Sequence, residues 1–562
     1  MKLQTLICCA LVCSLAPVAG QVKSGSVSTA SATEIPHLRK QGTATQLIVD
    51  GKPFLALAGE LLNSSATSLA YMKPLWPKLV QAKFNCILAG VSWNQIEPQE
   101  GKFDFSVLDG VIRDARIHNM RLVLLWFGTW KNGLSSYPPD WVKKDFERFP
   151  RAQMVGDKTN WPVFGGSRTQ VTGSLSIELL SPLSDASRDA DARAFAALMR
   201  HVKAVDGQQH TVIGIQVENE VGLQGDTRDR SPAANKAFEG PVPKELMDYI
   251  QKRKDTLIPE FRKVWEAAGF KTSGTWEEVF GKGRPADEIF MAWHFARYVG
   301  RVVEAGKAEY PIPMFLNCPQ TGFGRGLRGG QSGGPMPDAF DIWRAGAPRV
   351  DLFAADIYSP DFVGFTRRYT QSGNPLLIAE NRRGPELKGR ALYAFGRHDA
   401  IAFSPFGIDS MFGSSDTDVV GYDMVSQLAP LILAHQGNGT MSAVLLDPKD
   451  PPEKVQVGNY TLVVAPTRPR GAAGAQVPLP YAAIFISTGP DEFFVAGFGV
   501  TIGFSPNTPG APLAGLGTVE EGAFVNGRWV AGRQLAGDET EEGDYVSLYE
   551  PGIQHLTLYR YR

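Results

Sequence analysis

Eight short apolar runs alternate with segments of helical pattern, and this alternation restricts the fold more than any other feature of the sequence. Within each run the apolar residues are continuous rather than alternating, which is typical of parallel strands buried on both faces. Eight such strands with helices between them predict a (β/α)8 barrel with insertions. The runs are 54–60, 84–93, 121–130, 211–220, 312–317, 351–359, 375–381 and 399–407.

The segments between the runs have the pattern of amphipathic helices. Residues 106–119 and 192–205 each place their apolar side chains on one helical face. In the first segment that face consists of Val107, Leu108, Val111, Ile112 and Ala115. The longest insertions are expected after the third and fourth strands, and residues 223–285 are charged with a helical pattern.

The pattern changes from about residue 440, where apolar and polar residues alternate between Gly and Pro. The dipeptide Asn526-Gly527 is typical of a tight hairpin turn. We therefore expect the catalytic barrel to occupy residues 41–437 and an antiparallel, sandwich-like β-domain to occupy residues 438–562.

The first 40 residues predict a signal peptide and a flexible leader. One Lys precedes an apolar run, and Val18-Ala19-Gly20 offers small residues for cleavage before Gln21. Residues 1–20 are thus a predicted signal peptide, and the polar, Ser-rich residues 21–40 a loose leader. The apolar run is too short for a transmembrane helix, so we expect export to a bacterial periplasm, with a lipoprotein or secreted form as the alternatives.

Composition limits the partners of the chain. A net charge of -1 gives no reason to expect nucleic acid or an anionic membrane as a partner. Beyond the signal the chain keeps only Cys86 and Cys318, both in apolar runs, where buried free thiols are expected rather than a disulfide. The eight His show no metal-binding spacing, so no metal or other cofactor is expected.

Two glutamates at strand ends are the candidate catalytic pair. Glu220 ends the fourth run, in "IGIQVENEVG", and Glu380 ends the seventh, in "PLLIAE". Side chains at the carboxyl ends of barrel strands point into the active-site mouth, where these two can converge. Two carboxyl groups on either side of one bond are what glycoside hydrolysis requires. The alternative is that both belong to structural ion pairs. Asn219, beside Glu220, could donate a hydrogen bond to a sugar 2-hydroxyl.

Several motifs resemble those of glycoside hydrolase family 35, the β-galactosidases. The segment "QVENEVG" (216–222) is similar to the family signature Q-x-E-N-E-Y-G, and "WNQIEPQEGKFDF" (93–105) resembles W-N-x-H-E-P-x-x-G-x-F-D-F. "LVQAKFN" (79–85) is similar to the helix that enters the second strand. The resemblance covers roughly residues 45–440. It implies that Glu220 is the acid/base, that Glu380 is the nucleophile and that the anomeric configuration is retained.

The sequence also departs from the family pattern. Val221 replaces the Tyr after the acid/base, Ile96 replaces the His of the W-N-x-H-E-P motif, and Asn381 follows the nucleophile where an aromatic residue is usual. Lys131-Asn132 occupies the place of the family's Ala-Glu after the third strand, so that Asn132 stands where a sugar-contacting Glu would lie. These departures indicate a divergent bacterial branch, similar to enzymes that trim galactosyl side chains from xyloglucan.

The remaining candidates are substrate-binding residues. Glu60 ends the first strand, where the resemblance implies sugar contacts, with a structural ion pair as the alternative. Tyr358 ends the sixth strand and could hold Glu380 ionised by a hydrogen bond, the alternative being plain packing. Trp93 and Trp130 are candidate sugar platforms or, alternatively, rim core, whereas Trp126 is expected in the core. The substrate-binding set that we predict is Asn219, Glu60, Trp93, Asn94, Trp130, Lys131, Asn132 and Tyr358.

Two other motifs are rejected. The segment 324–329 satisfies G-x-G-x-x-G, but the residues after it cannot open a helix, so no dinucleotide site is expected. The sequence also lacks the G-x-S-x-G elbow of an esterase.

Together these features predict an exported, retaining exo-β-galactosidase that acts on plant-derived oligosaccharides. The alternatives are a retaining glycosidase of other specificity, such as a β-glucosidase, and a non-catalytic periplasmic carbohydrate-binding protein. The aglycone, the linkage and the oligomeric state do not follow from the sequence.

Overall fold

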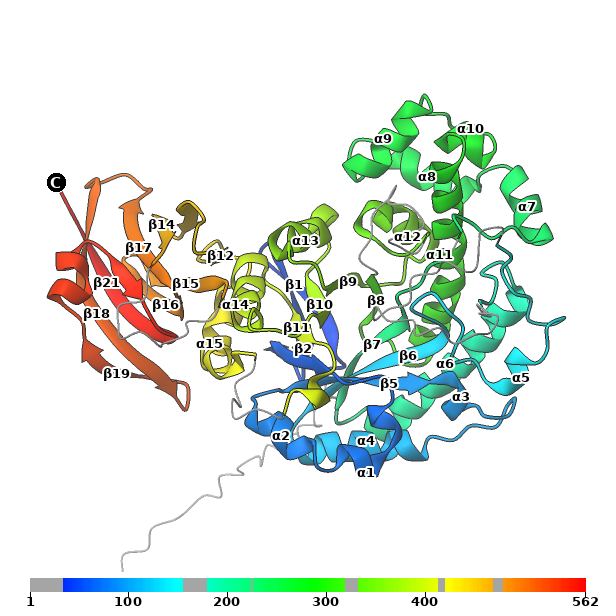
Figure 1. The fold of residues 1–562 in the computed structure, drawn as a ribbon, viewed down its shortest axis with the longest axis horizontal. Coiled ribbons are helices and arrows are strands. Elements are labelled where there is room, and N and C mark those ends of the chain that lie inside the picture. The colour runs from blue at the N-terminus through cyan, green and yellow to red at the C-terminus, as the bar shows by residue number, and fades with distance from the viewer. Residues whose placement is uncertain (1–33, 155–178, 224–225, 319–331, 413–419, 468–478) are drawn as a thin grey trace, which may run out of the picture.

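A closed barrel of eight parallel strands forms the centre of the molecule (Figure 1). The computed structural model describes residues 34–154, 179–223, 226–318, 332–412, 420–467 and 479–562. All eight predicted runs form barrel strands, which confirms the (β/α)8 prediction. The strands are β4 (Ala56–Glu60), β5 (Cys86–Ser92), β6 (Arg121–Lys131), β7 (Val212–Asn219), β8 (Met314–Cys318), β9 (Leu352–Ile357), β10 (Leu377–Asn381) and β11 (Ala402–Pro405).

The strands are buried on both faces, as their continuous apolar pattern requires. In β5, Leu88 belongs to the core inside the barrel, whereas Ile87 and Ala89 belong to the core between the strands and the outer helices. This two-sided burial explains why the runs are not alternating in sequence.

Helices surround the barrel and cover its strands. These helices are α2 (Trp76–Gln81), α4 (Ser106–Ile117), α6 (Asp185–Asp206), α11 (Arg284–Glu309), α12 (Phe340–Gly346), α13 (Phe362–Tyr369), α14 (Leu387–His398) and α15 (Tyr422–His435). The predicted apolar face of α4 is correct for four of its five residues. Val107 is the exception: it is 39% exposed, because it lies in the first turn, at the edge of the buried face.

The long insertions lie where they were predicted, after β6 and β7. The first contains α5 (Asp140–Lys143). The second contains α7 (Pro232–Glu239), α8 (Lys244–Lys252), α9 (Pro259–Ala267) and α10 (Trp276–Phe280), which stand beside α11 and α12 (Figure 1). Shorter helices, α1 (Leu69–Met72) and α3 (Trp93–Ile96), follow β4 and β5.

A small antiparallel sheet that was not predicted closes the amino-terminal end of the barrel. It consists of β1 (His37–Gln41), β2 (Ala44–Val49) and β3 (Lys52–Phe54). Leu47 and Val49 join the inner barrel core with Ala56 and Ile213. The expected leader 21–40 is therefore too long, because its last residues pair with β2.

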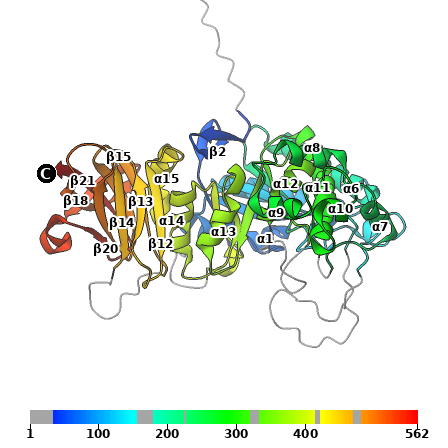
Figure 2. The same cartoon turned by 90° about the horizontal axis from the view of Figure 1, so that it is seen from above.

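The carboxy-terminal region folds into two antiparallel sheets around a core of their own (Figure 2). One sheet has the order β12-β15-β16-β21-β18-β19, and the other β13-β14-β17-β20. Val525 pairs with Arg528 across Asn526 and Gly527, both of which have positive φ, as predicted for this turn. The strands are β12 (Met441–Leu446), β13 (Glu453–Val457), β14 (Tyr460–Pro466), β15 (Tyr481–Gly489), β16 (Glu492–Phe498), β17 (Val500–Pro506), β18 (Leu513–Val525), β19 (Arg528–Gln534), β20 (Val546–Leu548) and β21 (Gly552–Tyr561).

One face of the six-stranded sheet packs against α14 and joins the apolar core around the barrel, whereas its other face belongs to the core between the two sheets. A Cβ on Gly396 would lie 2.7 Å from both Ala443 and Ile484, and only glycine permits this approach. Ile484 belongs to the same core as the helices around the barrel. The predicted boundary at residue 438 lies between α15 and β12 and stays a prediction.

The predicted signal peptide, residues 1–20, lies outside the described residues. Within the described part of the chain, no helix combines the length and the apolar character needed to cross a bilayer. Cys86 and Cys318 are free and buried, as expected.

Candidate active site

The end of β7 holds Asn219 and Glu220 at the carboxyl-terminal mouth of the barrel. Glu220 has a positive φ of 45°, a backbone conformation that is costly for a residue other than glycine. Its N–H donates to Oδ1 of Asn317, from the end of β8, at 2.9 Å. The backbone therefore turns sharply at the end of β7, and the hydrogen bond to Asn317 of β8 stabilises this turn.

The structure brings Glu380 to the same place. Glu380 lies in β10 and is 5% exposed. Its Oε2 accepts a hydrogen bond from the phenol of Tyr358, and Nδ2 of Asn219 lies 3.4 Å from its Oε1. Asn219, Glu220, Tyr358 and Glu380 thus converge from three strands of the barrel, as the sequence predicted.

Glu218 does not reach the mouth. Its carboxyl group accepts the backbone N–H groups of Thr129 at 3.1 Å and Trp130 at 2.7 Å, where the register of β6 against β7 shifts. The chain is so crowded there that a Cβ on Gly128 would lie 2.7 Å from Oε1 of Glu218. The buried Glu218 side chain therefore supports the bulge in β6.

The bulge places Lys131 inside the site. Lys131 pairs with Asn219 across the strands, and its Nζ donates to Oδ1 of Asn219 at 2.9 Å and to Oδ1 of Asn132 at 3.1 Å. Because the ammonium group binds the amide oxygen, the amide nitrogen of Asn219 faces Glu380. Lys131 therefore orients a catalytic-site amide, a role that its spacing in the sequence did not reveal.

Two further carboxyl groups lie beside the pair. Glu60, at the end of β4, is fully buried, and neither of its side-chain oxygens has a hydrogen-bond partner among the described residues. Asp356, in β9, is also fully buried and accepts a hydrogen bond from Nδ2 of Asn317 at 2.7 Å. Asp356 and Asn317 were not predicted from the sequence, although both stand at strand ends, which is the signal that could have identified them.

Burial and mutual repulsion govern the protonation of these groups. Burial and the neighbouring Glu380 carboxylate raise the pKa of Glu220 to about 7, against the opposing effects of Lys131 and of a hydrogen bond with Asp356. Burial and the nearby carboxylates raise the pKa values of Glu60 and Asp356 well above their usual range. The mouth thus places Glu220, whose raised pKa suits a proton donor, beside Glu380, whose oxygens face hydrogen-bond donors and whose position suits a nucleophile.

Two predicted sugar platforms are wrong. Trp93 is fully buried, donates to Glu97 at 2.8 Å and packs edge-on against Trp141. Trp130 is fully buried against Phe295 and Tyr298. Rings buried in the core between the strands and the helices have no face open to a sugar. Trp126 is in the core, as expected.

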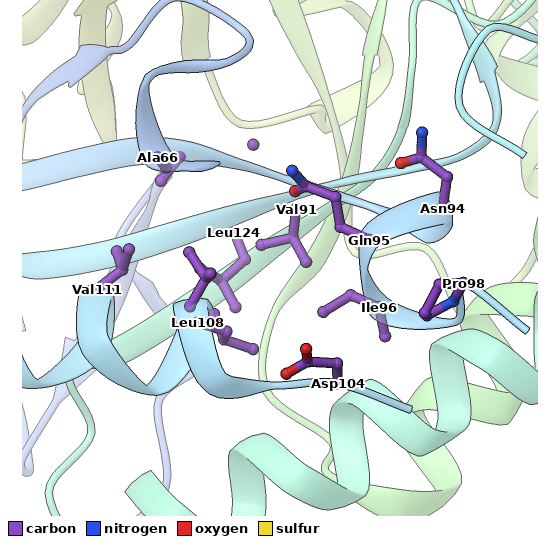
Figure 3. A pocket seen from close by; sticks show the side chains of 13 residues that line it. Ala66, Val91, Asn94, Gln95, Ile96, Pro98, Asp104, Leu108, Val111 and Leu124 are labelled. Carbon is purple, nitrogen blue, oxygen red and sulfur yellow. The ribbon is translucent and has the colours of Figure 1, made fainter. Parts of the chain in front are cut away.

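Asn94 lies apart from the clustered carboxyl groups. It is exposed and lines a cavity of about 320 Å³ on the outer side of β5 and β6 (Figure 3). The cavity is lined mainly by apolar side chains such as Val91, Leu108 and Leu124. Glu60, Glu220 and Glu380 are not among its lining residues.

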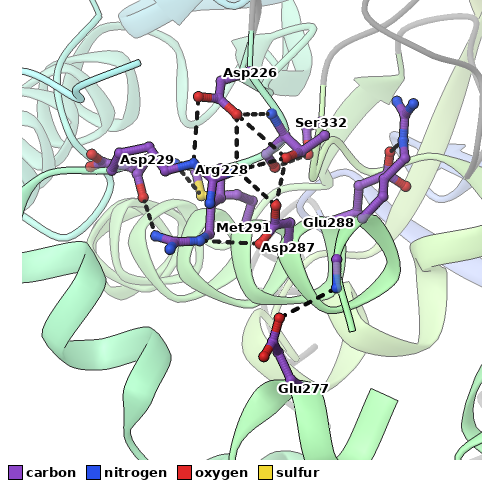
Figure 4. Close-up of polar contacts among 12 residues, drawn as sticks. Asp226, Arg228, Asp229, Glu277, Asp287, Glu288, Met291 and Ser332 are labelled. Carbon is purple, nitrogen blue, oxygen red and sulfur yellow. Dashed lines mark hydrogen bonds and ion pairs between the residues drawn. The ribbon is translucent and has the colours of Figure 1, made fainter. Parts of the chain in front are cut away.

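A buried ionic network anchors the segment that follows Glu220 to α11 (Figure 4). Oδ1 of Asp287 lies 3.1 Å from Nε of Arg228, and its Oδ2 accepts from Arg230 at 2.8 Å and from Thr227 at 2.5 Å. The network fixes one wall beside the mouth. The rejected G-x-G-x-x-G segment, 324–329, lies outside the described residues.

Asn381 stands where the family 35 pattern has an aromatic residue after the nucleophile. Its amide is used inside the protein, where Oδ1 accepts from Arg390 at 3.2 Å and Nδ2 donates to the carbonyl of Arg382 at 2.7 Å. The residue after Glu380 therefore secures α14 to the barrel.

Comparison with known proteins gives two family matches. Residues 76–281 match glycoside hydrolase family 42, which is described as beta-galactosidase. Residues 420–547 match a domain of unknown function, DUF5597. The first match includes Glu220 and ends before Glu380. Residues 76–281 are therefore similar to a β-galactosidase-type glycoside hydrolase, and the resemblance of the motifs to family 35 stays a prediction.

Individual relatives are distant. The beta-galactosidase of Xanthomonas manihotis is 28% identical over 194 residues, which are 34% of this chain and 27% of that protein, so the chain matches about a quarter of its relative's length. The beta-galactosidase of Bacillus circulans sp. alkalophilus has a TM-score of 0.43 at 15% identity and covers 67% of this chain and 57% of its own. The catalytic domain of beta-amylase from Paenibacillus polymyxa has a TM-score of 0.42 at 11% identity, covering 68% and 99%.

Proposed function

We propose that this protein is an exported, retaining exo-β-galactosidase that releases terminal β-galactosyl residues from plant-derived oligosaccharides such as those of xyloglucan. The observation that carries the proposal is the convergence of Glu220 and Glu380 at the mouth of the barrel, with the amide of Asn219 facing Glu380. The match to a β-galactosidase family over residues 76–281 supports the same class of reaction. The xyloglucan substrate and the family 35 assignment rest on the sequence motifs.

In the first step the ionised Glu380 attacks the anomeric carbon, and protonated Glu220 donates its proton to the leaving oxygen. The raised pKa of Glu220, about 7, supports this role, because the acid must keep its proton beside an ionised carboxylate. Tyr358 and Asn219 each face one oxygen of Glu380 and hold the nucleophile in place.

In the second step Glu220 acts as a base. Once Glu380 is esterified to the sugar, its negative charge is gone and no longer opposes the ionised form of Glu220. Glu220 then takes a proton from water, which attacks the anomeric carbon and releases the sugar with its configuration retained. Asn219 is positioned to bind the 2-hydroxyl, a contact that strengthens in the transition state.

The test compares wild type, Glu380→Gln and Glu453→Gln on nitrophenyl β-galactoside, with the β-glucoside and the α-arabinoside alongside. Glu453 lies in β13 of the carboxy-terminal domain and serves as the matched control. We expect galactoside turnover in wild type and control and at least a ~10³-fold loss in Glu380→Gln, because no nucleophile remains. Proton NMR of the first product should show the β-anomer, as retention requires.

Other outcomes identify the alternatives. Turnover of only the β-glucoside would support the same mechanism in an enzyme that is specific for glucose instead of galactose. Binding of xyloglucan oligosaccharides without turnover would favour a carbohydrate-binding protein. Cell fractionation tests the proposed export separately, since cytoplasmic retention would contradict the predicted signal without affecting the chemistry.

A further inference from the structure

Asp356 lies directly behind the proposed acid/base and belongs to none of the roles described so far. It is fully buried in β9. Its Oδ2 accepts from Nδ2 of Asn317, whereas Oδ1 has no hydrogen-bond donor among the described residues. A buried carboxylate oxygen without a donor is costly, which favours a neutral carboxylic acid at this position.

The carboxyl groups of Asp356 and Glu220 interact, and the interaction with Asp356 lowers the pKa of Glu220. Asn317 holds both residues, because its Oδ1 accepts the backbone N–H of Glu220 while its Nδ2 donates to Asp356. Two ionised carboxylates cannot share a hydrogen bond, so whenever Glu220 is ionised the proton between the two groups belongs to Asp356. Oδ1 of Asp356, which has no other hydrogen-bond partner among the described residues, is the oxygen available to carry it.

The surroundings favour the neutral form of Asp356. Burial comes first, and the carboxyl groups of Glu380, Glu220 and Glu60 add repulsion, so that the pKa of Asp356 is raised well above its usual range, with only Lys131 opposing. The other titratable groups that interact with Asp356 or Glu220 are Cys318 of β8, Tyr358 after β9 and Tyr369 of α13. Burial raises the pKa of each of these groups, so all three are neutral at neutral pH.

We propose that Asp356 is a positioning residue that stays protonated through the catalytic cycle and donates a hydrogen bond to Glu220 whenever Glu220 is ionised. The proposal rests on the proposed function and deepens it. No covalent bond to Asp356 forms or breaks. The proton that Glu220 gives to the leaving group in the first step is recovered from water in the second, and Asp356 keeps its own proton throughout.

The hydrogen bond from Asp356 offsets the effect of burial on the pKa of Glu220. Burial alone would hold Glu220 protonated, which suits the first step and opposes the second. A neutral donor stabilises the ionised form without adding a negative charge. Glu220 can therefore return to the carboxylate that must activate water.

The test measures the pH dependence of kcat/KM for wild type, Asp356→Ala, Asp356→Asn and the control Asp399→Asn. In Asp356→Asn the new amide can accept a hydrogen bond from Asn317 and donate one to Glu220. We therefore expect the basic limb of the kcat/KM profile of this variant to stay near that of wild type. Ala removes the donor, so the basic limb should move up by about one pH unit, and hydrolysis of the glycosyl-enzyme should slow by about 10-fold. Burst kinetics with a dinitrophenyl galactoside separates that step, since this leaving group needs no acid.

Asp399 is a matched control because it is half-buried, its pKa is raised to about 6 by burial, and it ends α14 in a left-handed conformation that Asn tolerates. The substitution Asp399→Asn should leave the pH profile of kcat/KM unchanged. If Asp356 were ionised instead, Asp356→Asn would remove a negative charge and move the basic limb down. That result, or equal behaviour of Asn and Ala, would overturn the proposal.

Infrared difference spectroscopy keeps the inference testable without turnover or if Asp356→Ala does not fold. Wild type minus Asp356→Asn at pH 7 should contain the C=O stretch of a protonated carboxyl group. A carboxylate band in its place would refute the proposal even if the enzyme were active. If the acid band were present in a protein that turns over no glycoside, the protonated state of Asp356 would be supported. Only the proposed function would then be refuted.

Discussion

The phenol of Tyr358 donates a hydrogen bond to Oε2 of Glu380, and the two residues come from the ends of neighbouring strands, β9 and β10. Asn219 faces the other oxygen of the same carboxylate at 3.4 Å. A carboxyl group with a donor facing each oxygen is fixed in orientation.

Replacing Tyr358 by Phe should therefore reduce kcat/KM about 10- to 100-fold, the usual loss for one hydrogen bond to a charged group. The ring and its packing are kept, so thermal stability should change little. The matched control is Tyr310→Phe, whose buried hydroxyl has no hydrogen-bond partner among the described residues. Equal kinetics of Tyr358→Phe and wild type would show that the hydrogen bond has no role in the reaction.

The pH profile should reveal the proposed acid. Burial raises the pKa of Glu220 to about 7, and Glu220 must be protonated to assist the leaving group. The protonated fraction falls as the pH rises through that value, so kcat/KM should fall tenfold per unit above it. With a dinitrophenyl leaving group, which needs no proton, this limb should flatten. A limb that is unchanged in Glu220→Gln would assign it to another group.

Lys131→Met should lower kcat/KM by about 10-fold or more, because Asn219 loses the cation that orients its amide. The positive charge of Lys131 also lowers the pKa of Glu220, so its loss should move the basic limb upward. Lys131→Arg, which keeps the charge, should restore the position of the limb. Lys144→Met, at an exposed position that follows α5, is the control.

Trp130→Ala should act on stability rather than on substrate affinity. The ring is fully buried against Phe295 and Tyr298, and removing a buried Trp costs about 3–5 kcal/mol of unfolding free energy. Urea denaturation measures this loss. A large increase in KM with unchanged stability would instead restore the sugar platform that the structure excludes.

The strands and the two glutamates at their ends could be predicted because both leave local signals in the sequence. Continuous apolar runs mark strands that are buried on both faces, and a Glu directly after such a run, as at Glu220 and Glu380, has a predictable place on a barrel. The β1–β3 sheet was missed because its short strands are buried only by closing the barrel, which no local pattern records.

The same limit explains the residues that were misassigned. Trp93 and Trp130 stand at strand ends in sequence, yet their rings turn into the core between the strands and the helices. Asp356 also stands near a strand end, but that position alone does not show which neighbouring side chain it contacts.

The sequence by itself determined the barrel, the carboxy-terminal β-domain and the positions of two carboxyl groups at strand ends, since periodicity and strand order are properties of the chain. Only the tertiary structure decided which polar groups meet. The bulge that brings Lys131 to Asn219, the clamp of Asn317 on Glu220 and Asp356, and the raised pKa of Glu220 arise from side chains of different strands buried together. Such contacts and the loss of water around them depend on distance in space, which sequence spacing does not contain.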